Sequence, residues 1–176
     1  MSQDERGFNT IEIIVVVFII SLIALGTGTT IFQVIRGTKQ CDSHMTSHRQ
    51  VQSAGYWITR DAQMADNVAT ENLSGTEFLV LGWTEVDDGE NTIDHSVTYF
   101  FEDLSEGIGT LKRNHSSNAG LDNEILVAQY IYYNPADPAN TSNVSYVSPT
   151  LIAKLMSIFE DTSSTAEYRV SCRPKL

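Results

Sequence analysis

The chain has 176 residues and a formal net charge of -11, from 22 acidic and 11 basic residues. This length allows one membrane helix and one soluble domain of ordinary size, but excludes two large domains. The acidic balance argues against a nucleic-acid-binding protein, because neutralising phosphates requires clustered Lys and Arg, and here the basic residues are spread along the chain.

The first predicted element is an apolar run from Phe8 to Leu25. At about 1.5 Å per residue, a helix of this length spans a hydrocarbon core of about 30 Å. One acid, Glu12, interrupts the run in its first turn, where an unpaired charge costs at least roughly a few kcal/mol. We therefore expect Glu12 to have a partner and a function.

The residues around this acid carry a resemblance to a known family. Gly7 and Phe8, followed by Thr10, Ile11 and Glu12 and the apolar run, resemble the prepilin signal of type IV pilins and type II secretion pseudopilins. The resemblance implies a leader at 1–7, cleavage between Gly7 and Phe8 by a membrane peptidase, and N-methylation of Phe8. The cationic amine of Phe8 would then neutralise Glu12 of a neighbouring subunit, so that two costly charges become one attractive pair.

Two simpler interpretations compete with the prepilin signal. An ordinary secretory signal also begins with a short polar stretch and continues into an apolar core, and a plain single-pass anchor would tolerate the same run. Neither accounts for Glu12, nor for the glycine that precedes Phe8. We therefore favour 8–26 as a transmembrane and filament-core helix.

Residues 27–71 are predicted to form the amphipathic second half of the same long helix. Small and apolar side chains recur there at mostly three- and four-residue steps, which is typical of a helix packed on one side. The preceding run from Gly26 to Thr30 has low helix propensity, so a bend or local melting is expected there. A long bent helix whose second half packs under a β-sheet is what the resemblance to pilins implies.

Two cysteines and two histidines raise the question of a covalent or metal link. An exported domain would lie where disulfides persist, so Cys41 and Cys172 are candidates for a bridge from the helix to the last strand, with two separate thiols as the alternative. Cys41, His44 and His48 fall on neighbouring helical turns. Zinc sites usually take ligands from two elements and need a fourth ligand, so we predict neither a metal nor a cofactor.

Residues 72–176 are predicted to form a β-rich head, so the fold class is α+β: a long helix packed against an antiparallel sheet. The β-prone runs are 77–83, 97–101, 109–113, 125–133, 151–159 and 168–172. The first two should form a hairpin. The run 151–159 fits a helix or a strand, and the resemblance favours a strand. The acidic loop 85–94 does not have EF-hand spacing, so we interpret it as a solvated loop rather than a calcium site.

The order of the short strands, and the closing strand that ends at Cys172, resemble the larger minor pilins and the J-type pseudopilin. This resemblance implies a structural subunit of a type IV pilus-like filament, in the first place a minor pilin, with a type II secretion pseudopilin as the alternative. The implied partners are other pilin or pseudopilin subunits, the prepilin peptidase and methyltransferase, an inner-membrane assembly platform and membrane lipid. The head would be extracytoplasmic, first on a single-pass membrane protein and then in the filament.

A function from another class is a membrane-anchored enzyme or ligand-binding domain. Such a protein should contain a nucleophile, a base and an orienting acid in recognisable local motifs. The sequence has no such set, and His95 and His115 stand alone in it, so we expect no enzymatic activity.

Overall fold

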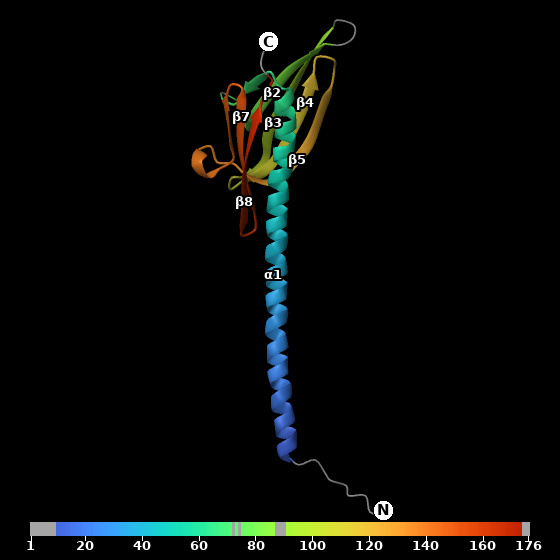
Figure 1. Ribbon diagram of the computed structural model, residues 1–176, viewed down its shortest axis with the longest axis vertical. Coiled ribbons are helices and arrows are strands. Elements are labelled where there is room, and N and C mark those ends of the chain that lie inside the picture. The colour runs from blue at the N-terminus through green and yellow to red at the C-terminus, as the bar shows by residue number, and fades with distance from the viewer. Residues whose placement is uncertain (1–9, 72, 74, 87–90, 174–176) are drawn as a thin grey trace, which may run out of the picture. The chain divides into compact units, whose positions relative to one another are not determined.

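A computed structural model describes residues 10–71, 73, 75–86 and 91–173. The chain divides into two compact units, Met1–Asp42 and Ser43–Leu176, and each is described by itself. The helix α1 (Thr10–Met64) begins in the first unit and ends in the second, and every strand belongs to the second unit, the head (Figure 1). The predicted α+β class, a long apolar N-terminal helix and an antiparallel sheet, is confirmed.

The helix α1 differs from the prediction at two places. Helical structure continues through 26–30, where Thr27 and Thr30 donate hydroxyl hydrogen bonds to the carbonyl oxygens of Ile23 and Gly26, so the expected local melting does not occur. The helix ends at Met64 rather than near 71, because the chain turns there into a short strand at the edge of the sheet.

In the part of the chain that the structure describes, eight strands form one antiparallel sheet in the order β1-β2-β3-β4-β5-β7-β6, with β8 on the other side of β7. The strands are β1 (Asn67–Ala69), β2 (Glu77–Val86), β3 (Thr92–Ser105), β4 (Ile108–Ser117), β5 (Asp122–Tyr132), β6 (Asn143–Val147), β7 (Thr150–Phe159) and β8 (Thr162–Ser171), with a short 3-10 helix at Pro138–Asn140. All six predicted runs are strands, and the predicted hairpin is formed by β2 and β3. The sequence analysis missed β1 and β6.

The core of the head lies between the sheet and the helix segment 43–64, which crosses one face of the sheet (Figure 1). The strands place alternate side chains on this face, as a pleated strand requires. The buried apolar side chains of the helix and of the central strands include Val51, Ala54, Ile58, Ala62, Leu79, Leu81, Val97, Tyr99, Phe101 and Leu111. Small residues let the helix approach closely: a Cβ at Gly55 would overlap the ring of Tyr168.

Between β5 and β7 the sheet has a seam, because these two strands pair only at Ile131 and Ser157. Backbone groups of β5 and β7 beside the seam form hydrogen bonds with side chains of the helix. Ser47 Oγ donates to Ser157 O at 3.0 Å, Ser53 Oγ donates to Val127 O at 2.7 Å, and Gln129 N donates to Gln50 Oε1 at 2.8 Å. Polar side chains on α1 are thus bonded to backbone groups on both sides of the seam.

Candidate functional site

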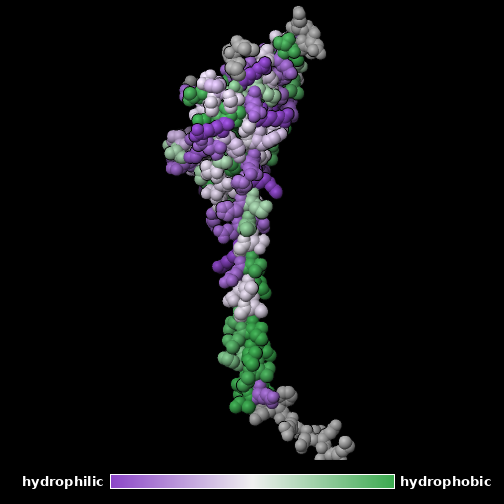
Figure 2. Space-filling model, in the orientation of Figure 1, coloured by the Kyte–Doolittle hydropathy of each residue, from purple (hydrophilic) through white to green (hydrophobic). Residues whose placement is uncertain are grey.

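The first candidate is the apolar part of α1. Its most apolar 18-residue window has a mean hydropathy of 2.6, and 0 % of that window is buried. Figure 2 shows the hydrophobic side chains gathered over this part of the helix. Ile11 and Leu25, near its two ends, are 66 % and 69 % exposed. Among the described residues this is the helix long and apolar enough to cross a membrane, and its surface needs a lipid or protein environment.

Glu12 lies in the first turn of this helix and its side chain is exposed. It forms no ion pair with any described residue. The N-terminal end of a helix carries a partial positive charge, which favours an acid at this position. Gly7 and Phe8 lie outside the described residues, so cleavage between them and pairing of the Phe8 amine with Glu12 stay predictions.

The bridge considered for Cys41 and Cys172 is not formed: both are free thiols, Cys41 exposed and Cys172 buried. Cys172 is 3 % exposed, it belongs to the apolar core, and its backbone N donates to Pro149 O at 2.7 Å. Burial raises the pKa of the Cys172 thiol. The structure therefore has the alternative arrangement, two separate thiols.

The helical histidines do not form a metal site with Cys41. His48 contacts Ser164 Oγ through Nδ1 at 3.3 Å and Gln52 Nε2 through its own Nε2 at 2.9 Å, so both ring nitrogens already have partners. In the part of the chain that the structure describes, no three metal-binding side chains come together.

A buried ion pair in the head was missed by the sequence analysis. Asp61 on α1 is 1 % exposed and accepts two hydrogen bonds from Arg113 on β4, from Nε at 2.6 Å and from Nη2 at 3.1 Å. The hydroxyl of Tyr99 on β3 donates to the same carboxylate at 2.5 Å. The Arg113 guanidinium also lies over the ring of Trp57, 5.3 Å from its centroid. Helix, β3 and β4 are thus joined through one carboxylate.

The surroundings of Asp61 keep its two partners protonated, because the pKa values of Tyr99 and Arg113 are both raised. Burial, followed by the charge of Asp61, raises the pKa of Tyr99 far above its ordinary value, so the phenol stays protonated and donates. Burial, the largest single effect, would lower the pKa of Arg113, but the hydrogen bonds to Asp61, the charge of Asp61 and the neighbouring Tyr99 together outweigh it and raise the pKa. Such a bidentate, hydrogen-bonded pair positions the helix on the sheet. Each member of the group therefore has its hydrogen-bond partner inside the head.

The sheet also brings together two histidines that are far apart in the sequence. His95 Nδ1 lies 3.2 Å from His115 Nε2, and the ring of Trp83 stacks on both, at centroid distances of 5.1 Å and 5.4 Å. His95 Nε2 is 3.3 Å from Glu85 Oε2, an ion-pair distance without hydrogen-bond alignment. Burial, then Arg113 and then His95, lowers the pKa of His115. His95 and His115 stand alone in the sequence, and the pairing of β3 with β4 makes them neighbours in the structure.

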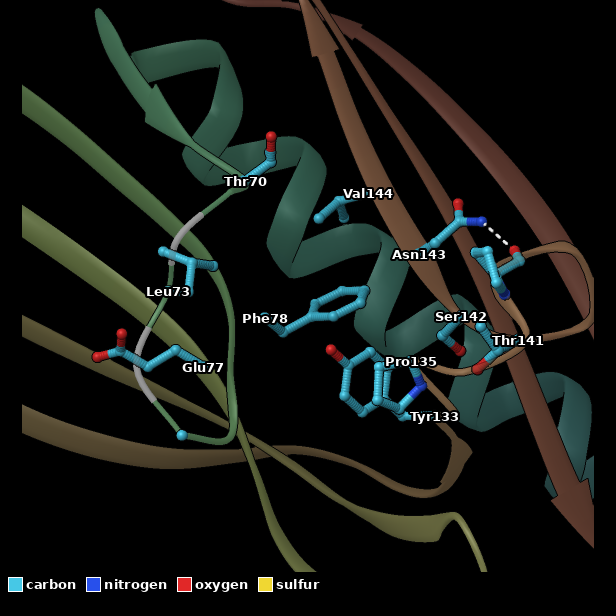
Figure 3. Close-up of a pocket in the computed structure, with 12 residues that line it drawn as sticks. Thr70, Leu73, Glu77, Phe78, Tyr133, Pro135, Thr141, Ser142, Asn143 and Val144 are labelled. Carbon is cyan, nitrogen blue, oxygen red and sulfur yellow. Dashed lines mark hydrogen bonds between the residues drawn. The ribbon is translucent and has the colours of Figure 1, made fainter.

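A shallow groove of about 310 Å³ lies between the loop before β2 and the loop before β6 (Figure 3). Phe78, Tyr133 and Val144 line it together with hydroxyl groups, and Asn143 Nδ2 donates to Pro138 O at 2.6 Å. The described residues that line it include one acid, Glu77, and neither a histidine nor a cysteine.

Comparison with known proteins identifies no relative: no family model, no curated protein and no solved structure matches the chain.

Proposed function

We propose that the protein is a structural subunit of a type IV pilus-like filament, anchored in the membrane by the N-terminal half of α1 before it polymerises through that half. The observation that carries this proposal is the apolar N-terminal segment of α1, whose most apolar window is 0 % buried, with one acid, Glu12, in its first turn. A membrane satisfies the apolar side chains, and a neighbouring cation at the same depth would pair with the acid.

The head supports an assembly role more than a catalytic one. The described part of the head contains a structural ion pair, a stacked histidine pair and open grooves, and none of these unites a nucleophile with a base and an orienting acid. A type II secretion pseudopilin uses the same helix and the same acid, and stays the alternative within this class.

Mass spectrometry of the amino terminus tests the proposal. Chain isolated from membranes of cells that contain a prepilin peptidase should begin at Phe8 and carry an added methyl group. A chain that keeps Met1, or that begins near residue 26 after signal-peptide cleavage, contradicts it. Shearing the cells should release a filament fraction that contains the processed chain, which a plain membrane anchor would not give.

A further inference from the structure

A second groove lies on the head, between α1 and β8. It has a volume of about 520 Å³ and is lined by Gly55, Tyr56, Thr59, Arg60 and Tyr168, with a glutamine at either end. Tyr56 is 62 % exposed, and the ring of Tyr168 covers Gly55 closely. The groove therefore offers two aromatic rings to an apolar side chain and one guanidinium, that of Arg60, to an acid.

The end of β3 and the start of the turn that follows it, residues 103–106, have the complementary chemistry, and we call them the acidic turn. Leu104 is 39 % exposed and is flanked in the sequence by Asp103 and Glu106, two exposed acids with positive φ angles of 53° and 52°. Neither acid forms an ion pair with a described residue, whereas the preceding Glu102 pairs with Lys112 Nζ at 2.6 Å. The acidic turn thus exposes an apolar side chain between two uncompensated carboxylates.

We propose that the acidic turn of one copy docks in the groove between α1 and β8 of a second copy. Leu104 packs against Tyr56 and Tyr168, and Asp103 and Glu106 lie beside Arg60. The apolar contact supplies attraction that does not depend on charge, and the carboxylates give the contact its orientation. We choose the acidic turn as the occupant because it has one apolar side chain between two acids. The groove has the complementary groups, aromatic rings and one cation.

A second copy is the occupant that the charge distribution favours. At a net charge of -11, two copies repel each other unless an acidic feature meets a local cation, and Arg60 in the groove is such a cation. The two patches differ, so the contact is heterologous: each copy has one groove and one turn, and the contact repeats into a ring or an open helical filament. The inference rests on the proposed function and names the head contact that accompanies helix packing.

Cysteine cross-linking in membranes of cells that express the full chain tests the contact. In a Cys41→Ser background, a chain with Ser105→Cys is expressed with a differently tagged chain that carries Gln52→Cys at the end of the groove. A short bifunctional maleimide should join the two tags. The matched control replaces Ser105→Cys by Ala119→Cys, an exposed position on the turn between β4 and β5. We expect at least about fivefold more mixed dimer from the first pair, and equal yields overturn the proposal.

A charge exchange tests the electrostatic part. Arg60→Glu should lower the yield of the mixed dimer roughly fivefold, because an attraction becomes a repulsion. Adding Asp103→Arg and Glu106→Arg to the chain that carries Ser105→Cys should restore the yield of the mixed dimer. Arg49→Glu makes the same charge change on an exposed helix position outside the groove, and should leave the yield unchanged. A lack of recovery in the exchanged pair, or an equal loss from Arg49→Glu, contradicts docking at Arg60.

The outcomes separate this contact from the proposed function. Sheared filaments that lack the mixed dimer refute the docking contact and leave the filament proposal standing. Mixed dimers in membranes without any sheared filament refute the filament proposal alone. If Gln52→Cys is shielded from a monofunctional maleimide but does not cross-link to the acidic turn, the groove has a different occupant and the proposal fails.

Discussion

The two units of the chain use apolar side chains in opposite ways. In residues 10–42 the apolar side chains of α1 are exposed, and the most apolar window has no buried part. In the head, residues such as Val51, Leu81 and Val97 are fully buried between helix and sheet. The two ends of the helix therefore need different surroundings. The apolar side chains of its C-terminal segment are buried by the sheet of the same chain, whereas those of its N-terminal segment need lipid or another protein to cover them. Substitutions in the head should change folding, and substitutions in the apolar segment should change insertion and assembly.

The largest effect is expected for the buried ion pair. Asp61→Ala leaves Arg113 buried without its carboxylate, so the free energy of unfolding of the head should fall by about 3–5 kcal/mol. Both tryptophans, Trp57 and Trp83, lie in the head, so their fluorescence during denaturant unfolding of the full chain in detergent reports on this unit alone. Asp42→Ala, an exposed acid in the first unit, is the control and should leave the midpoint unchanged.

Asp61 could not be foreseen in this role, because its partners lie 52 and 38 residues further along the chain. The available signal was its position in the helical periodicity, on the side that also carries Ile58 and Ala62. An acid on a buried helix face indicates a buried partner but does not say which one.

The next effect concerns Glu12. Glu12→Val removes a charge from the apolar segment, so membrane insertion should improve, by at most about 2.5–3.5 kcal/mol, the value that insertion scales assign to a charge at the centre of a membrane helix, and unfolding of the head should not change. The processed chain should nevertheless be depleted from sheared filaments, because the Phe8 amine of the neighbour loses its counter-ion. Glu12→Gln should behave in the same way, and normal incorporation of both variants rules out the pairing mechanism.

Two glycines sharpen the contrast between the units. Gly55→Ala places a Cβ into the ring of Tyr168, and overpacking of this kind should destabilise the head by about 1–3 kcal/mol. Gly37→Ala, on the exposed part of α1 with nothing within 4 Å of the added Cβ, should leave the head unchanged and favour helix by up to about 1 kcal/mol. Tryptophan fluorescence for the head and far-ultraviolet circular dichroism for the helix distinguish the two. A stable Gly55→Ala head contradicts the close helix–sheet contact.

The smallest effect is a pH dependence at the stacked histidines. Folding lowers the pKa of His115 below its ordinary 6.5, so between the folded pKa and about 6.5 the unfolded chain binds more protons than the folded chain. His115 therefore does not reduce the free energy of unfolding above about pH 6.5. As the pH falls below this value the free energy of unfolding decreases, by less than about 1 kcal/mol because the ring is partly exposed. His115→Gln should therefore lose less stability than the wild type between pH 7.5 and 5.5. His44→Gln, on an exposed helix position, should match the wild type.

Strands were predictable where several β-branched or aromatic residues follow one another, as in 77–83 and 97–101. The strands β1 and β6 have only three and five residues, and each pairs with one neighbour at an end of the strand order, β1 with β2 and β6 with β7. The apolar segment with Glu12 was visible in the sequence because its length and its single acid are local features. Grooves and the histidine pair depend on strand register, which local patterns do not give.

The seam between β5 and β7 has a mechanical consequence. Ser53 of α1 is bonded to one side of the seam and Ser47 to the other, while Asp61 is bonded to β4 further along the helix. A pulling force on the helix segment 43–64 is therefore divided between both parts of the sheet. These hydrogen bonds and the apolar contacts are loaded in shear by this force. They therefore resist it together instead of breaking one after another. A subunit loaded in tension would transmit that load through its head without first separating β5 from β7.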